Sequence, residues 1–307
     1  NLWTVASLAP NTSATVIISA RVDIALMNSV SFDLGVAKDY NLFVLNDYTA
    51  PSSDTEGKVA VGNDCRISSY SVGDKLPNSG GTEDVLVVGH NLYFTSGRVY
   101  HGNVVYGNYA EVTPYVASIM EGTLRKDTVI DFQAAAAHLL SLSSQFAAYG
   151  VHGSAGLQFG KLALHGSDPS LNVFKIWGDT LGMANDFEIN VPNGSSVLVN
   201  IFGSYAEWKG GLNVYGTPYS NVLYNFVEAD SIKISNIDVR GSILAPRTNV
   251  NFVSGVQNGQ MVAKNAKGIG QYNLILFRGN IPLDTTVVNV AEVVDAVQHD
   301  PDPRPNN

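Results

Sequence analysis

The feature that most constrains this fold is a long succession of short apolar strands separated by Gly or Asn. Three examples are GKVAVGNDCRI (57–67), DVLVVGHNLYF (84–94) and GRVYHGNVVYGNY (97–109). Alternating apolar residues indicate strands, and Gly and Asn take positive φ angles at low cost where a strand ends. Short strands joined by corners predict a mainly β fold, a β-solenoid whose rungs stack. A β-sandwich uses the same strands and remains the competing architecture.

The solenoid is expected to run as one continuous core over residues 32–280, with alternate apolar side chains turned inward. The positions predicted to point inward are Val59, Val61, Val87, Val104, Val197, Val199, Ile232, Ile234 and Ile243.

One segment, 127–149, has the pattern of a helix. Asp131 is placed to cap it, Ala134 to Ala137 have high helix propensity, and Gly150 follows as a stop. An apolar stripe recurs at three- and four-residue steps at Phe132, Ala135, Leu139, Leu142 and Phe146. We therefore predict a single lateral α-helix over 130–149 that packs on the flank of the solenoid.

Composition narrows the possible partners. Of 307 residues, 45% are hydrophobic and only 15% charged, and the net charge is −9. Nucleic-acid binding needs a basic stripe, and electrostatic binding to a membrane surface needs basic clusters, so both partners are excluded. No stretch is long and apolar enough to predict insertion into a membrane. The single cysteine, Cys65, permits no intrachain disulfide and is expected to be buried in a strand.

Residue patterns for catalysis are not found in the sequence. The six histidines lack HExxH spacing, and no GxSxG motif is present. We expect no enzyme activity, no metal site and no cofactor, and a protein that acts by binding.

Several sequence blocks resemble the choice-of-anchor A domain family. The blocks are LGVAKDYNLFVLNDY, EGKVAVGND, LVVGHNLYF, GNVVYG, LNVFKI, NDFEINVPNGSSVLVNIFG, NVLYNF, GSILAPRTNVNF and GQMVAKNAKGIGQYN, in that order. That family occurs on bacterial surface proteins, and related domains occur in amoebal cyst-wall lectins. The resemblance implies a β-helix with a lateral α-helix, a role in adhesion, and a place outside the cell, at the cell surface or in the cell wall.

The two flanks are similar to pieces of an Ig-like stalk repeat of bacterial surface proteins. These pieces lie close together in that repeat, whereas about 260 residues separate them here. We therefore divide the chain into an Ig-like fragment at 1–24, the choice-of-anchor A β-helix at 25–283 and a second Ig-like fragment at 284–307. The abrupt start at Asn1 is read as the start of an excised fragment, whose targeting segment and first Ig-like strands lie elsewhere. Asn11 and Asn193 each begin a glycosylation triplet.

Aromatic residues give the most specific hypothesis about a ligand. Tyr and Trp offer rigid apolar surface with a polar group, which suits stacking on sugar rings. Five of them stand where the resembled family usually has small or polar residues, and we predict them as the ligand-binding set: Trp208, Tyr205, Tyr100, Tyr215 and Tyr219. They are expected to lie together on one flat face, as in a lectin-like adhesin that binds an insoluble polysaccharide such as cellulose or chitin.

Two other functions stay open. An ice-binding protein with a related β-helix would need regular ranks of Thr or small residues, and TNVNF, FTSG and SIKIS do not supply clear ones. A structural or collagen-binding spacer, with other surface proteins as partners, would need no sugar site.

Overall fold

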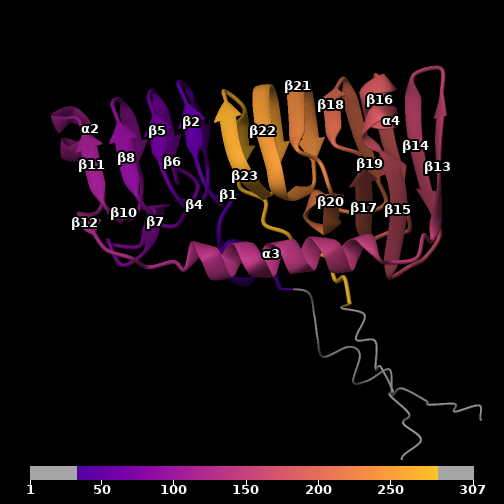
Figure 1. The fold of residues 1–307 in the computed structure, drawn as a ribbon, viewed down its shortest axis with the longest axis horizontal. Helices are drawn as coiled ribbons and strands as arrows, with labels where there is room; N and C mark the ends of the chain where they lie inside the picture. The colour runs from indigo at the N-terminus through magenta and orange to yellow at the C-terminus, as the bar shows by residue number, and fades with distance from the viewer. Residues whose placement is uncertain (1–32, 283–307) are drawn as a thin grey trace, which may run out of the picture.

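A computed structural model describes residues 33–282, which form a three-faced β-solenoid with one long helix along its side (Figure 1). The predicted mainly β solenoid is therefore confirmed. Nearly all strand pairs are parallel, as stacking of successive rungs requires; the pair β13–β14 is antiparallel. The predicted Ig-like fragments at 1–24 and 284–307 lie outside the described residues.

The first face carries the long helix and is called the helix face. In spatial order its strands are β12 (Leu124–Lys126), β10 (Asn103–Tyr106), β7 (Asp84–Val88), β4 (Val59–Val61), β1 (Leu42–Val44), the start of β23 (Met261–Gly268), the start of β22 (Ser242–Asn258), β20 (Val222–Phe226), β17 (Ser196–Phe202) and β15 (Leu171–Trp177).

The second face carries no long helix. Its strands are β11 (Tyr109–Val112), β8 (Asn91–Phe94), β5 (Cys65–Ile67), β2 (Tyr48–Ala50), the end of β23, the middle of β22, the start of β21 (Ser231–Arg240) and β18 (Tyr205–Lys209). The short helix α4 (Gly178–Met183) continues this face beyond β18.

The third face closes the triangle. It consists of β9 (Gly97–Val99), β6 (Tyr70–Val72), β3 (Ser53–Thr55), β24 (Gln271–Asn273) and the ends of β22 and β21. A smaller sheet extends it with β19 (Gly211–Tyr215), β16 (Asp186–Asn190), β14 (Lys161–Gly166) and β13 (Gly153–Gln158). Short helical turns are η1 (Gly35–Asp39), α2 (Pro114–Ser118) and η2 (Tyr219–Asn221).

The order of the strands along the chain differs from their order along the solenoid. It enters at the middle with β1 and proceeds rung by rung to the end that holds β12 (Figure 1). The helix α3 (Phe132–Ala147) then runs back along the solenoid, and the second half returns from β15 to the middle. There β23 pairs with β1, so that Leu42 lies opposite Met261.

Helix α3 confirms the predicted helix, with ends two residues inside the expected bounds. Asp131 caps it through a 2.9 Å hydrogen bond that the Ala134 amide donates to the carboxylate. Of the predicted stripe, Ala135, Leu139, Leu142 and Phe146 are buried against the helix face and Phe132 is half-buried. Ser143 on the same side donates a hydrogen bond to Asn225 of β20, at 2.6 Å.

The positions predicted to point inward are all buried, but Val87 lies on the other side of its strand. Val87 belongs to the apolar cluster outside the solenoid interior that also contains Phe43 and Leu139. Strand β7 is apolar on both sides because the segment 127–132, which leads into α3, crosses its outer surface. Alternation of apolar residues therefore cannot show which side of β7 faces inward. Cys65 is buried in β5 as predicted, and burial raises the pKa of its thiol far above the usual value.

Candidate functional site

The second face presents a row of side chains fixed by the strand register. This central row consists of Glu111, Tyr93, Arg66, Thr49, Lys267, Asn251, Lys233 and Glu207, one from each strand in spatial order. Adjacent strands lie about 4.8 Å apart, so the row is a regular ladder of outward groups. Its members alternate along each strand with buried residues such as Tyr48 and Ala50.

A second row lies beside the central row and is rich in amides. This amide row consists of Asn265, Asn249, Ser231 and Tyr205. Asn46 donates to the Asn265 side-chain oxygen at 2.8 Å, and Asn265 donates to that of Asn249 at 2.7 Å. Asn249 in turn donates to the backbone carbonyl of Asp230 at 3.0 Å. These bonds hold the amide groups in fixed orientations across three rungs.

The two rows border a shallow groove of about 610 Å³ over β2, β23, β22 and β21. Lys233 and Lys267 line it together with Thr49, Asn251 and the edge residue Tyr205. Lys233 donates to Glu207 at 3.0 Å, and this hydrogen bond raises the pKa of Lys233 and lowers that of Glu207. The groove is therefore polar, with Asp47 and Lys267 in its lining and one ion pair at its β18 side.

Aromatic and acidic groups lie toward the β11 end of the second face. The Arg66 guanidinium lies 3.7 Å from the ring centroid of Tyr93, and the Tyr109 ring is 6.0 Å from that of Tyr93. Asp64 accepts hydrogen bonds from His90 and Asn91 at 3.0 and 2.9 Å. Desolvation raises the pKa of Asp64, but these bonds outweigh it and hold the pKa below its usual value.

Side chains on the third face form hydrogen bonds with one another. Arg240 contacts Asp238 at 3.1 Å and Asn213 at 3.2 Å, and Asn273 donates to Asn258 at 2.8 Å. These residues are half-buried by their mutual contacts.

Trp208 is not part of any surface. It is 1% exposed and points into the solenoid, where its ring lies 4.8 Å from that of Tyr224 and 6.1 Å from that of Phe187. The cause is the phase of β18, in which Glu207 and Lys209 point outward and Ala206 and Trp208 inward. The prediction that Trp208 binds a ligand is wrong, because no polymer can reach it.

The structure does not bring the other four predicted aromatics together. Tyr205 is 47% exposed and lies on the second face. Tyr215 ends β19 on the third face and is 51% exposed. Tyr219 is half-buried in η2, with the Arg240 guanidinium 5.4 Å from its ring, and Tyr100 follows β9 and stacks on Arg98 at 4.5 Å. Tyr205 and Tyr215 belong to one rung but to different faces, and Tyr100 and Tyr219 lie outside the strands.

Sequence reasoning missed Tyr93 and Tyr109, which do lie on the second face with Tyr205. Tyr93 lies between the buried Leu92 and Phe94, and Tyr109 begins a strand in which Ala110 and Val112 point inward; this alternation was the available signal. The polar residues of the groove were also missed, since only the pairing of β2 with β23 places Thr49 beside Lys267.

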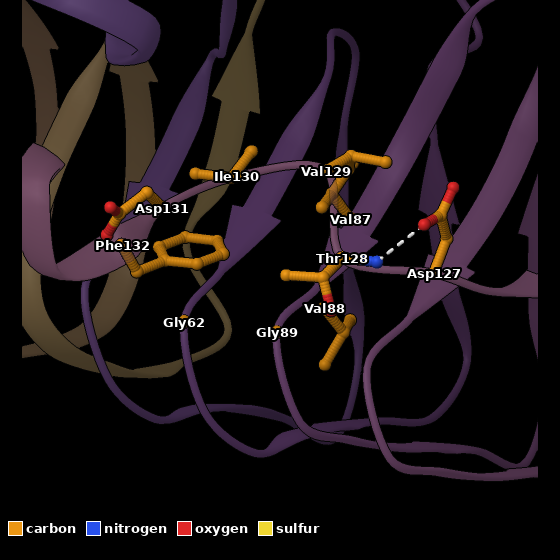
Figure 2. A pocket seen from close by; sticks show the side chains of 10 residues that line it. All are labelled: Gly62, Val87, Val88, Gly89, Asp127, Thr128, Val129, Ile130, Asp131 and Phe132. Carbon is orange, nitrogen blue, oxygen red and sulfur yellow. Dashed lines mark hydrogen bonds between the residues drawn. The ribbon is translucent and has the colours of Figure 1, made fainter.

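A separate hollow of about 490 Å³ lies where the segment 127–132 crosses the rungs of β4 and β7 (Figure 2). Val87, Val88, Val129 and Phe132 supply its apolar lining, and Asp127 and Asp131 stand at its two ends. Asp131 caps α3 and the Asp127 carboxylate accepts its neighbour's amide, so both carboxylates already serve the backbone. The hollow is a consequence of how the chain enters α3.

Within residues 33–282, no group of three His, Cys, Asp or Glu is arranged to hold a metal ion. In the same range, none of the helices has both the length and the apolar character needed to span a bilayer.

The parallel, three-faced stack of strands with an extended polar second face places the described residues in the class of β-solenoid domains. Residues 33–274 match the model of the family described as "Putative Ice-binding-like adhesive domain", and the chain belongs to that family. A sequence search of the curated proteins found no match.

Three similar solved structures are ice-binding proteins. One, from the Antarctic ascomycete Antarctomyces psychrotrophicus, is 9% identical with a TM-score of 0.37, and the match covers 81% of this chain and 100% of that one. One from an Antarctic biological consortium is 12% identical with a TM-score of 0.40, covering 85% and 94%. The third, from Shewanella frigidimarina, is 11% identical with a TM-score of 0.39, covering 82% and 99%.

These findings correct the predicted function. The expected polysaccharide adhesin is wrong: the family is ice-binding-like, and Trp208, one of the five aromatics predicted to bind the polymer, is buried. The coarser prediction, an adhesive β-helical domain, is confirmed by the family.

Proposed function

We propose that this chain is an adhesive domain that binds ice and that the second face is the surface applied to the crystal. The observation that carries the proposal is the match to an ice-binding-like adhesive family over residues 33–274. The geometry of the second face supports it. A periodic solid is best contacted by a rigid surface with periodic groups, and the central row and the amide row repeat at the strand spacing of about 4.8 Å.

The polar groups of this face differ from the threonine ranks expected of an ice-binding solenoid. Thr49 is joined by Asn251 in the central row and by Asn249 and Asn265 in the amide row. The amides are held by the ladder from Asn46 to Asp230, so that little side-chain entropy is lost when they meet a surface. The hydrogen-bonded asparagines of the amide row would contact ice where other ice-binding solenoids would use ranks of threonine.

The test is partition into slowly growing ice, measured as the fraction of protein incorporated. Asn251→Tyr places a bulky ring in the middle of the second face and is expected to reduce the incorporated fraction severalfold. Asn190→Tyr, on the exposed end of β16 in the third face, is the matched control and should behave as the parent. Equal loss in both variants, or no incorporation of the parent protein, contradicts the proposal.

We also propose that the domain is displayed outside the cell, at the cell surface, and that its finer relationship is to the choice-of-anchor A family. The quoted sequence blocks support the relationship. The adjacency of β1 and β23 supports an insertion between two Ig-like pieces, because it brings the first strand of the described domain beside one of its last. Ile17→Cys with Val290→Cys tests the insertion, since paired flanks predict a disulfide between them under mild oxidation. Failure of the two cysteines to react refutes it.

A further inference from the structure

The two ends of the solenoid differ in how their edge strands are protected from pairing with another chain. At the β12 end, α2 covers the last rung and buries Val116 completely. The edge strands there carry charged residues, among them Arg98 in β9, Glu111 in β11 and Arg125 in β12. Charged side chains on edge strands discourage pairing with another chain.

At the opposite end, the edge strand β13 lacks such protection. It pairs only with β14 and stands at the extreme edge of the solenoid (Figure 1). The stretch 150–160, GVHGSAGLQFG, holds no Asp, Glu, Lys, Arg or Pro. Ser154, Ala155 and Gly156 are exposed. The unpaired edge of β13 can therefore accept a further β-strand.

The hairpin tip beside β13 presents an apolar group to solvent. Phe159 is fully exposed and has a φ of +49°, in a two-residue turn with Gly160 at +79°. A φ in this range is unfavourable for a side chain as large as Phe. Val151, just before β13, is 53% exposed. Both a strained backbone and an exposed ring are thus held beside the free edge.

We propose that β13 pairs with β13 of a second copy of this chain, in antiparallel fashion about a two-fold axis through Ala155. A two-residue turn is closed by a hydrogen-bonded pair, here Gln158 and Lys161. The alternation of the antiparallel ladder then directs the amide and carbonyl groups of Gly153, Ala155 and Leu157 to the free edge.

This register is self-complementary. With Ala155 opposite its own copy, Gly153 faces Leu157, and each of these positions has its backbone groups directed at the partner. Val151 of one copy is carried close to Phe159 of the other, which would shield both. No like charges meet across the axis, because residues 150–160 carry none.

The test combines the oligomeric state with a cysteine cross-link at the axis. Sedimentation velocity from micromolar to sub-millimolar protein should show a monomer–dimer equilibrium. In Ala155→Cys the two Cα atoms lie about 5.5 Å apart, as in a hydrogen-bonded antiparallel pair, which a disulfide can span. Mild oxidation should therefore convert most of this variant to covalent dimer. The native Cys65 is buried and does not interfere.

Thr49→Cys is the matched control, because Thr49 is exposed on β2, whose two edges are both paired. Ala155→Lys should shift the equilibrium to monomer with unchanged circular dichroism, and mixing it with Ala155→Glu should restore dimer. Wild-type protein that stays monomeric throughout, with Ala155→Cys cross-linking no faster than Thr49→Cys, overturns the proposal.

Discussion

The indole of Trp208 packs edge-on against the ring of Tyr224, with 4.8 Å between the ring centroids and 73° between the planes. Trp208 comes from the second face and Tyr224 from the helix face, so their contact joins two faces across the interior. Phe187 and Phe226 complete the cluster at 6.1 and 6.2 Å from the indole. A residue predicted to bind a ligand is thus the largest side chain of the core.

Replacing Trp208 by Ala should lower the free energy of unfolding by about 3–5 kcal/mol, since truncation of a large buried aromatic leaves a cavity. Urea denaturation measures the loss. Tyr205→Ala, three residues earlier and 47% exposed, is the control and should change stability by less than about 1 kcal/mol. Similar small losses in both variants would show that Trp208 is not packed as described.

The polar network under α3 gives a second prediction. Asn225 donates to the Ser143 carbonyl at 2.9 Å and to Asn200 at 2.8 Å, and Asn200 donates to the Phe146 carbonyl at 2.7 Å. Asn225→Ala leaves buried groups without partners and should cost about 1–3 kcal/mol in thermal or urea unfolding. Ser144→Ala, on the exposed side of the same helix, should be nearly neutral. Equal effects would contradict the network's role.

The ion pair between Asp84 and Arg125 predicts a dependence on pH. The guanidinium bonds both carboxylate oxygens, at 2.6 and 2.8 Å, and holds the pKa of Asp84 below its usual value. A carboxyl group whose pKa is lowered by folding contributes stability above its unfolded pKa, near 3.9, and loses it as the pH falls through the folded value. The stability difference between the parent and Asp84→Asn should therefore be largest at neutral pH and shrink below about pH 4. Urea unfolding at several pH values measures it, and a difference that stays constant with pH would refute the assignment.

A column of glycines beside α3 gives a fourth prediction. A Cβ on Gly89 would overlap the carbonyl oxygen of Gly62 in the next rung and approach the Phe132 ring. Gly89→Ala should therefore cost about 1–3 kcal/mol, the usual effect of overpacking. Gly156→Ala, where an added Cβ meets open space, is the control. Thermal unfolding compares the two, and a stable Gly89→Ala would mean that the rungs can separate there.

Local patterns were sufficient to predict the strands, their corners and α3, because each depends on neighbours within a few residues. The local pattern also indicates the orientation of Trp208. In YAEWK the polar Glu207 and Lys209 are expected to point outward, which places Trp208 inward. The prediction of Trp208 as an exposed ligand-binding residue disregarded this alternation. At Val87 the pattern does not indicate which side chains point inward, because the run VLVV is apolar on both sides of the strand.

The order of the rungs and the composition of the second face were not predictable from the sequence. Thr49 and Lys267 are neighbours only because β2 pairs with β23, across more than two-thirds of the chain. Nothing local to either residue encodes that pairing. The groove between them follows from the return of the second half of the chain to the middle of the solenoid.

That return has a consequence for how the protein folds. Each half of the solenoid grows from contacts between consecutive rungs, whereas the junction of β1 with β23 joins Leu42 to Met261 and closes a loop of most of the domain. Closing a long loop is entropically costly, so we expect the junction to form last, after both halves and α3. Substitutions at Met261 should then mainly accelerate unfolding and leave the refolding rate unchanged. The groove of the second face spans this same junction, so the protein should acquire its binding surface only in the final step of folding.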